Sequence, residues 1–424
     1  MNSGRHTMES LLIAIFVACC LAGATAVASS NAEQLDSFKR HGDLVSQRRH
    51  LWTVLIDMTN ASVAYGTAPF ASWYGQDAVF HRGANDDAAP PLTRRGLSRM
   101  RMVADDAHTA GAPSLQSADA PILTYTLYNA AAYDHIRRHQ LHLRTELDRL
   151  RRSGAADRSV AGNRSVSDFP ADAIVIKTAW WPVARNLPTP LPVWDAGRNP
   201  PRSGGNDYLS WRRVVAVDPT KTRNSAGQVA VDFAGQSYPA ARRVSLNDFY
   251  NLRVDEEMAL EFRKDPAVNK AALLVLGRSL EAGDHLVLVG ANLATKEIND
   301  WVWGTLWWHD QAGTGPFAAD RPSVVRPPWT NYLVQVAFDA ETPKTSDGAP
   351  HVCFNPWLEG RFPDGGQGGG TASNCLACHR RASYPAVAFL PVTRGAPNLH
   401  SDPAYAQDRL RTNFIWAIAL HAKQ

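Results

Sequence analysis

The spacing of apolar positions predicts helices in the first third of the chain. Residues 35–58 have helical periodicity, and residues 129–152 place five apolar side chains along one stripe of a helix. That stripe consists of Ala132, Ile136, Leu143, Leu147 and Leu150. Between the two segments, residues 83–91 are rich in Pro, Gly and Asp, which is typical of a loop.

Runs of β-branched and aromatic residues in the middle of the chain predict strands. They cover residues 173–181, 285–290, 301–308 and 332–338. One helix is expected to interrupt them, with Ser245 as its N-cap, Asp248 behind the cap and a run that continues to Phe262. Because the strands follow one another without regular alternation with helices, an antiparallel sheet is favoured over a doubly wound one. The expected fold class is α+β.

The first residues have the pattern of an export signal. Arg5 and His6 precede an apolar run over residues 11–21, and small residues follow with an Ala-x-Ala pattern that ends at Ala28. The run is too short to anchor the chain in a bilayer, and no later stretch of about 18 apolar residues follows it. We therefore expect a cleaved signal peptide, a periplasmic mature protein and no transmembrane anchor after cleavage.

These patterns divide the chain into four parts. The signal peptide (1–28) is followed by a mainly helical region (29–165), a β-rich region (166–345) with the antiparallel sheet, and a C-terminal segment (346–424). The formal net charge of +4 is small and its acids and bases are interspersed, so no nucleic-acid partner is expected. Thirteen tryptophans, gathered mostly around the predicted strands, indicate a large aromatic core.

The most informative motif is the pentapeptide Cys375-Leu376-Ala377-Cys378-His379. In the Cys-x-x-Cys-His spacing, two thiols attach a haem through its vinyl groups and the adjacent histidine is held under the iron. Cys375 and Cys378 are therefore the expected attachment sites of one covalent haem c, and His379 is the expected axial ligand. Two of the five cysteines lie in the expected signal peptide, so Cys353 has no partner and is expected to be a buried small hydrophobic residue.

Two other functions of the cysteine pair compete with haem attachment. A thioredoxin-like pair should follow a strand inside a βαβ unit, whereas this pair follows the glycine-rich residues 365–370, expected to be a flexible linker. A structural zinc site needs a second pair of ligands, for which Cys353 and His400 are available. The histidine directly after the second cysteine favours haem.

The second axial ligand is not fixed by the motif. No methionine follows His379, which excludes a His–Met ligand pair within this segment. His400, in a loop sequence, is the candidate for this position; His421, in an apolar run, and an open site are the alternatives.

Other histidines whose spacing or neighbours suit a metal are His135, His139, His142, His309 and His351. Arg380 and Arg381 are placed to pair with a haem propionate, or else form part of an exposed helix.

By this motif the chain resembles mono-haem c-type cytochromes of the bacterial periplasm, over about the last fifth of its length. With the run Phe354-Asn355-Pro356-Trp357-Leu358-Glu359 it is also similar to large exported proteins that contain a cytochrome c domain. The resemblance implies electron transfer with a periplasmic redox partner protein. The alternative is a haem enzyme or gas sensor with an open distal site for a small nitrogen or oxygen species. A similarity to β-sheet cytochromes, some of which cross-link haem to a lysine, singles out Lys296.

Overall fold

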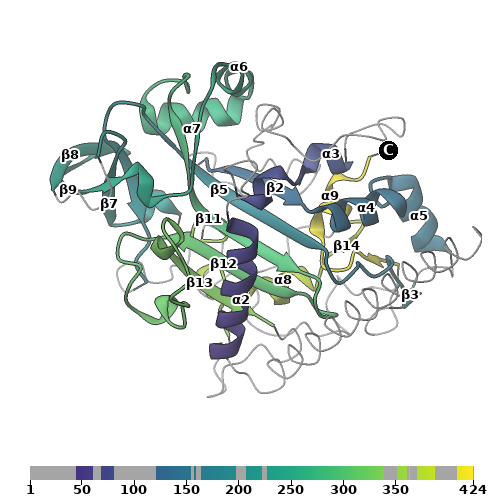
Figure 1. Cartoon of the computed structure of the whole chain (residues 1–424). Helices are drawn as coiled ribbons and strands as arrows, with labels where there is room; N and C mark the ends of the chain where they lie inside the picture. The colour runs from purple at the N-terminus through teal and green to yellow at the C-terminus, as the bar shows by residue number, and fades with distance from the viewer. Residues whose placement is uncertain are drawn as a thin grey trace, which may run out of the picture.

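The described part of the chain forms one large sheet, two small sheets and helices on both faces of the large sheet (Figure 1). The computed structural model describes residues 44–60, 68–80, 121–153, 157–158, 164–196, 207–221, 227–338, 351–360, 362, 370–386 and 408–423. The expected signal peptide lies outside these residues. The predicted fold class, α+β with an antiparallel sheet, is confirmed.

The large sheet is antiparallel throughout and has seven strands. Six follow in the order β1 (Tyr74–Gly75), β2 (Leu123–Tyr128), β5 (Ile174–Val183), β11 (His285–Thr295), β12 (Val302–Trp308) and β13 (Tyr332–Ala337), and β10 (Asn251–Arg253) also pairs with β11. The four predicted strands are confirmed as β5, β11, β12 and β13. Every residue of β12 and β13 is buried, because the sheet is covered on both faces.

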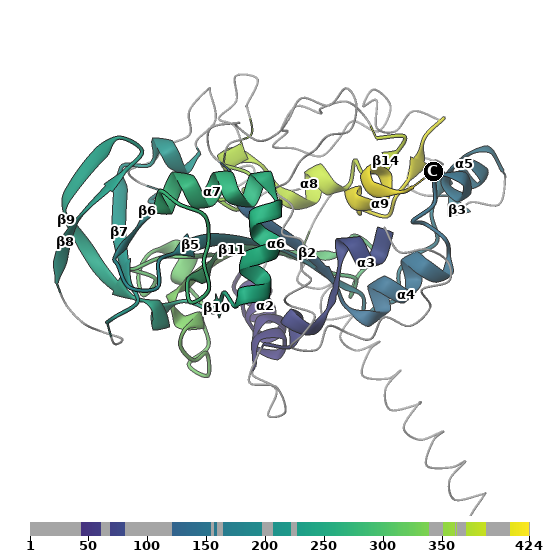
Figure 2. The ribbon, with the colours of Figure 1, turned by 90° about the horizontal axis from the view of Figure 1, so that it is seen from above.

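Two glycines show how closely the chain packs on each face of this sheet. On one face, a Cβ at Gly304 would lie 2.3 Å from a methyl carbon of Leu51 in α2 (Leu44–Thr59). On the other, a Cβ at Gly290 would lie 2.8 Å from the Asn355 side chain. Gly290 pairs with Trp307, three residues from Gly304, so the two glycines face opposite sides. Figure 2 shows the same arrangement, with α2 on one side of the strands and the C-terminal helices on the other.

The predicted helix over residues 129–152 is wrong as a single element. Two helices, α4 (Ala130–Arg138) and α5 (Arg144–Arg152), are separated by a turn in which Gln140 has a φ of 53°. A residue in this left-handed conformation cannot continue a right-handed helix. The other predicted helix is confirmed from residue 44 onward by α2, and its earlier residues lie outside the described ranges.

The helix predicted to begin at Ser245 is also corrected. Ser245 and Asp248 do form a capping box, but it caps only the short 3-10 helix Leu246–Asp248. The α-helix α6 (Glu256–Lys264) begins later, where the Asp255 side chain accepts a hydrogen bond from Met258 N at 2.8 Å. It is followed by α7 (Pro266–Leu276). The remaining 3-10 helices in the described ranges are Pro69–Ser72, Tyr208–Ser210, Pro316–Ala318, Trp329–Asn331 and Gly370–Ala372.

The two small sheets lie at opposite ends of the molecule (Figure 2). One has the order β6 (Thr189–Val193), β7 (Arg213–Asp218), β9 (Gln236–Ser245) and β8 (Gln228–Phe233). The other has the order β14 (Ser383–Tyr384), β15 (Leu410–Arg411), β4 (Arg164–Ser165) and β3 (Asp157–Arg158). Strands from before residue 165 therefore join both the large sheet and the C-terminal strands, so the sequence regions interleave in space.

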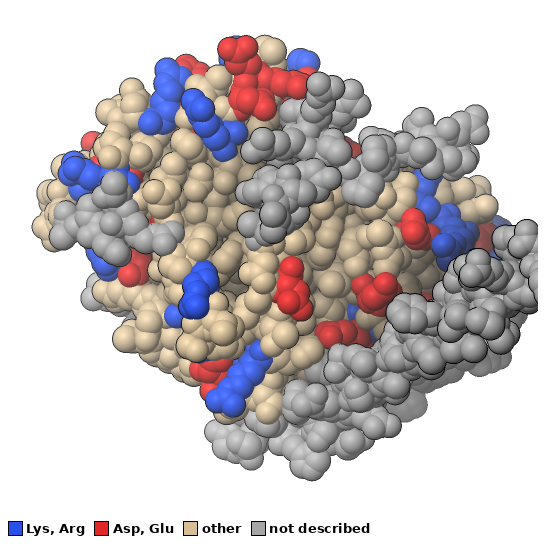
Figure 3. All heavy atoms as spheres, in the orientation of Figure 1, with Lys and Arg blue, Asp and Glu red and all other residues tan. Residues whose placement is uncertain are grey.

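The second small sheet adjoins α3 (Gln76–Phe80), α4, α5 and α9 (Trp416–His421) at one end of the molecule. None of the helices in the described ranges has the length and apolar character needed to cross a bilayer. On the face that carries α2, Lys and Arg are scattered among Asp and Glu rather than gathered into one patch (Figure 3).

Candidate functional site

The pentapeptide forms its own short helix, α8 (Cys375–His379), against the large sheet. Asn374 caps it, with its side-chain oxygen accepting a hydrogen bond from Ala377 N at 3.1 Å. The residues just before α8 pair in parallel with Cys353, through hydrogen bonds from Cys353 N to Ser373 O and from Cys375 N to Cys353 O. The start of α8 is therefore held by backbone pairing, and Gly370, the last residue of the expected flexible linker, is buried.

A row of polar side chains across the sheet positions the segment before α8. Lys177, Asn292, Thr305 and Gln335 are paired residue by residue across β5, β11, β12 and β13, so they share one face. Asn292 Nδ2 donates to Glu359 Oε1 at 2.6 Å, and Phe354 N donates to Gln335 Oε1 at 2.9 Å. This polar row is the surface on which residues 353–360 are fixed.

His379 is held in one orientation by a backbone carbonyl. Its Nδ1 lies 2.8 Å from Phe414 O, and a carbonyl only accepts hydrogen bonds, so Nδ1 carries the proton and Nε2 has a free lone pair. Burial, with a smaller effect of Lys177, lowers the pKa of His379 to about 4, which keeps the ring neutral near pH 7. The ring packs against Trp303 with centroids 4.1 Å apart. A histidine that donates through one nitrogen to a carbonyl and offers the other is the usual metal-ligating form.

The Phe414 carbonyl is itself placed by unusual backbone. Asn413 and Phe414 have φ values of 48° and 67°, in the left-handed region. Asn413 holds this turn through its side chain, which accepts from Trp301 Nε1 at 2.8 Å and donates to Asp168 Oδ1 at 2.6 Å. Sequence reasoning missed this support, because any residue can supply a backbone carbonyl. The only sequence signal is Asn413 itself, one of the residues that tolerate a positive φ.

The two cysteines of α8 have different surroundings. Cys375 is buried and its Sγ donates to Cys353 O at 3.1 Å, whereas Cys378 is exposed. Cys353 is completely buried, as expected, but it lies beside Cys375 rather than apart from the motif. The two motif cysteines and the free Nε2 of His379 come from one turn of helix, and this donor set fits a covalent haem c. Attachment at Cys375 would replace its S–H contact with the Cys353 carbonyl.

Cationic side chains surround α8. Arg380 and Arg381 are buried, at 5% and 4% exposure, which excludes their being part of an exposed helix face. Arg381 donates to Ala377 O at 2.9 Å, and the charge of Lys177 acts on His379. Positive groups near His379 would suit the carboxylates of a haem.

The structure does not place Lys296 as a cross-linking residue. Its ammonium group contacts Asp168 Oδ1 at 2.9 Å and donates to Asn299 O at 2.9 Å and Ile298 O at 3.4 Å. A lysine poised to attack haem would be neutral and unengaged, whereas this one is held in an ion pair. The position of Lys296 therefore does not support the similarity to lysine-linked β-sheet cytochromes.

Most of the other candidate histidines have protein partners. His309 accepts from Gln311 N at 2.9 Å and contacts Asp195 at 3.3 Å, and His351 contacts Val336 O at 2.5 Å. His421 lies in α9, with its ring 6.0 Å from that of Phe80. His400 lies outside the described residues.

Of the three histidines expected on one helical face, His135 and His139 lie together, with ring centroids 4.5 Å apart, whereas His142 falls beyond the end of α4. His135 is in the helix, His139 caps it and His142 follows in the turn. Burial, with the neighbouring His139, lowers the pKa of His135 to about 4, and its Nε2 lies 3.2 Å from Ser167 O. His135 and His142 are therefore buried packing residues, His139 is exposed, and in the described ranges the three do not form a metal-binding group.

The competing functions of the cysteine pair find little structural basis. Over the described ranges, no group of three or more His, Cys, Asp or Glu side chains is arranged to hold a metal ion, although a zinc site with His400 falls outside them. The pair follows a 3-10 helix and an isolated bridge, not a strand of a βαβ unit, which is unlike a thioredoxin motif.

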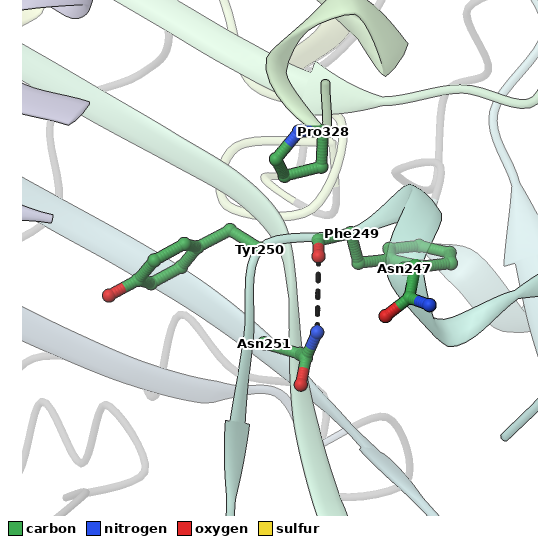
Figure 4. Close-up of a pocket in the computed structure, with 5 residues that line it drawn as sticks. All are labelled: Asn247, Phe249, Tyr250, Asn251 and Pro328. Atoms are coloured by element: carbon green, nitrogen blue, oxygen red, sulfur yellow. Dashed lines mark hydrogen bonds between the residues drawn. The ribbon is translucent and has the colours of Figure 1, made fainter. Parts of the chain in front are cut away.

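An open pocket of about 470 Å³ lies far from α8. It is lined by Asn247, Phe249, Tyr250, Asn251 and Pro328 (Figure 4). Asn251 pairs with Val287 and Trp303 with Ala294, so the pocket and α8 are seven residues apart along β11, roughly 23 Å. The Asn251 amide is used within the pocket wall, where it donates to Phe249 O at 3.2 Å. The pocket is therefore not part of the site around α8.

Comparison of the chain with protein-family models, with curated proteins and with solved structures returns no match.

Replacing Asn413 by Ala is expected to destabilise the turn that supports His379. The change leaves the buried Trp301 Nε1 without its acceptor, which costs about 1–3 kcal/mol, and it also removes a residue suited to a positive φ. Asn413→Gly loses the same contacts but keeps the backbone freedom, so urea unfolding should rank wild type above Gly and Gly above Ala. Equal stability of all three proteins would contradict this role of the Asn413 side chain.

Proposed function

We propose that this chain is an exported c-type cytochrome that binds one haem through Cys375, Cys378 and His379 and transfers electrons to or from a periplasmic redox protein. The observation that carries the proposal is the orientation of His379, whose Nδ1 donates to Phe414 O and whose unprotonated Nε2 has no hydrogen-bond partner among the described residues, on the same turn as the two cysteines. When bound, haem supplies an iron that changes reversibly by one electron.

The chain's own residues would attach, orient and shield the cofactor. Cys375 and Cys378 would each hold one vinyl group through a thioether, an addition of S–H across a double bond that needs no oxidant. Phe414 O fixes the imidazole, and the Trp303 ring excludes water from one side of it. Lys177, Arg380 and Arg381 would supply positive charge to pair with the haem propionates.

Absorption and EPR spectra of the purified ferric protein test electron transfer against the open-site alternative. A carrier needs two protein ligands, so we expect a low-spin, six-coordinate iron that His400→Ala converts to high spin, with His421→Ala as the matched control that leaves it low-spin. If the unmodified protein is already high-spin and binds carbon monoxide or nitric oxide readily, the haem enzyme or gas sensor replaces the carrier.

A further inference from the structure

Cys353 and Cys375 lie side by side in the structure. Cys353 N donates to Ser373 O at 2.9 Å and Cys375 N donates to Cys353 O at 3.0 Å, the ladder of a parallel bridge between residue 353 and residue 374. With strands roughly 4.8 Å apart and a rise of roughly 3.3 Å per residue, the Cα atoms of residues 353 and 375 are expected roughly 6 Å apart. That separation lies within the range that a disulfide bridges.

The sulfur of Cys375 also lies beside the backbone of Cys353. The Cys375 Sγ lies 3.1 Å from Cys353 O, and the neighbouring Cys353 thiol, together with burial, raises the pKa of Cys375 above its usual value. Cys353 is fully buried and Cys375 is 7% exposed, so neither meets an external oxidant directly. Cys378, three residues further along, is exposed. The three cysteines thus range from the exposed Cys378 to the fully buried Cys353.

We propose that Cys353 and Cys375 form a disulfide in the chain that has not received haem, and that Cys353 thereby competes with haem for Cys375. The inference of the disulfide rests on the positions of the two cysteines and does not depend on haem. The inference of competition rests on the proposed function. The proposal makes Cys353 the partner of Cys375, whereas the sequence alone predicted only a buried small hydrophobic residue.

The exchange balances with a disulfide-bearing thiol oxidase or a small-molecule disulfide as oxidant. The Cys378 thiolate attacks the oxidant's disulfide and releases one of its thiols; the Cys375 thiolate then displaces the second thiol and forms a bond with Cys378. The Cys353 thiolate attacks the Cys375 sulfur and expels Cys378, which takes up a proton. In total, two thiols lose two protons and two electrons, and the oxidant becomes a dithiol or two thiols. Because Cys375 is already turned toward Cys353, the last step needs little movement of α8.

Peptide mapping of the full chain distinguishes the pairings. Trypsin cleaves after Lys344, Arg361 and Arg380, so Cys353 falls in peptide 345–361 and both motif cysteines fall in peptide 362–380. The haem-free protein is treated with oxidised glutathione and then denatured in the presence of N-ethylmaleimide, which alkylates free thiols. Digestion should then yield these two peptides joined, with Cys378 alkylated. Dithiothreitol should separate them. A closed loop within peptide 362–380, or three alkylated cysteines, would overturn the disulfide.

Two variants separate this inference from the proposed function. Cys353→Ala should abolish the joined peptides and, when haem is supplied in an oxidising compartment, raise the haem-bearing fraction at least twofold, whereas Cys378→Ala, which removes the exposed thiol that reacts with the oxidant, should lower the yield of joined peptides. An unchanged haem fraction in Cys353→Ala overturns the competition. If no protein, including wild type, acquires haem, the proposed function fails while the peptide map still decides the disulfide.

Discussion

We expect that replacing both Cys375 and Cys378 by Ala abolishes covalent haem. Each thioether needs the sulfur of one motif cysteine, and in the described ranges the remaining cysteine, Cys353, is fully buried beneath α8. On a denaturing gel stained for haem, the wild-type band should therefore disappear completely in the double variant, while the amount of protein on a parallel gel shows whether the chain is still produced.

The matched control is Cys353→Ala, which removes the third cysteine and should keep the stained band at the wild-type level or above. Single replacements of Cys375 or Cys378 should each lower the stained signal, because only one thioether can form. A stained band that survives the double change would refute covalent attachment at this motif, and with it the assignment of the chain as a c-type cytochrome.

Replacing Asn355 by Ala is expected to give the largest loss of stability among single changes near the site. The Asn355 side chain is fully buried between the sheet and the segment before α8. Its amide donates to Thr305 Oγ1 and Leu306 O, each at 2.9 Å, and its oxygen accepts from Trp357 N at 3.0 Å. Each buried group left without a partner costs about 1–3 kcal/mol, so a total loss of roughly 3 kcal/mol or more is expected.

Urea unfolding followed by tryptophan fluorescence would measure this loss, since Trp357 contacts the ring of Trp181 in the core. Asn251→Ala is the matched control. The Asn251 amide makes only bonds of 3.2 and 3.4 Å at the edge of the open pocket, and we expect less than about 1 kcal/mol from its removal. Equal losses in the two variants would show that Asn355 does not join the C-terminal segment to the sheet as described.

The central strands were predictable because burial on both faces leaves unbroken apolar runs in the sequence. β12, with every residue buried, is the clearest example. Strand β2 was missed although its Thr and Tyr residues favour strands, because it lies just before a strong helix signal. The capping box at Ser245 was correctly recognised as a cap, but the residues after Phe249 join the sheet as β10, so tertiary pairing ended the helix that the local signal predicted.

At the candidate site, the sequence identified the residues whose chemistry depends on side-chain type and spacing. It could not identify their supports. Phe414 acts through its carbonyl, and Cys353 becomes a neighbour of Cys375 only through pairing across 22 positions. Lys177 appeared as one polar residue inside a strand run, and its position on the face near His379 follows from strand register, which the sequence does not specify alone.

The hydrogen bond from His379 to Phe414 makes the order of synthesis matter for assembly. A chain that has emerged only as far as residue 413 already contains both cysteines and the histidine, yet it lacks the acceptor that selects which ring nitrogen bears the proton. Until that carbonyl is in place, either nitrogen can carry the proton and the ring can turn. If the chain binds haem as proposed, the ring orientation that ligation needs depends on the β14–β15 pair, which brings the final residues back to α8.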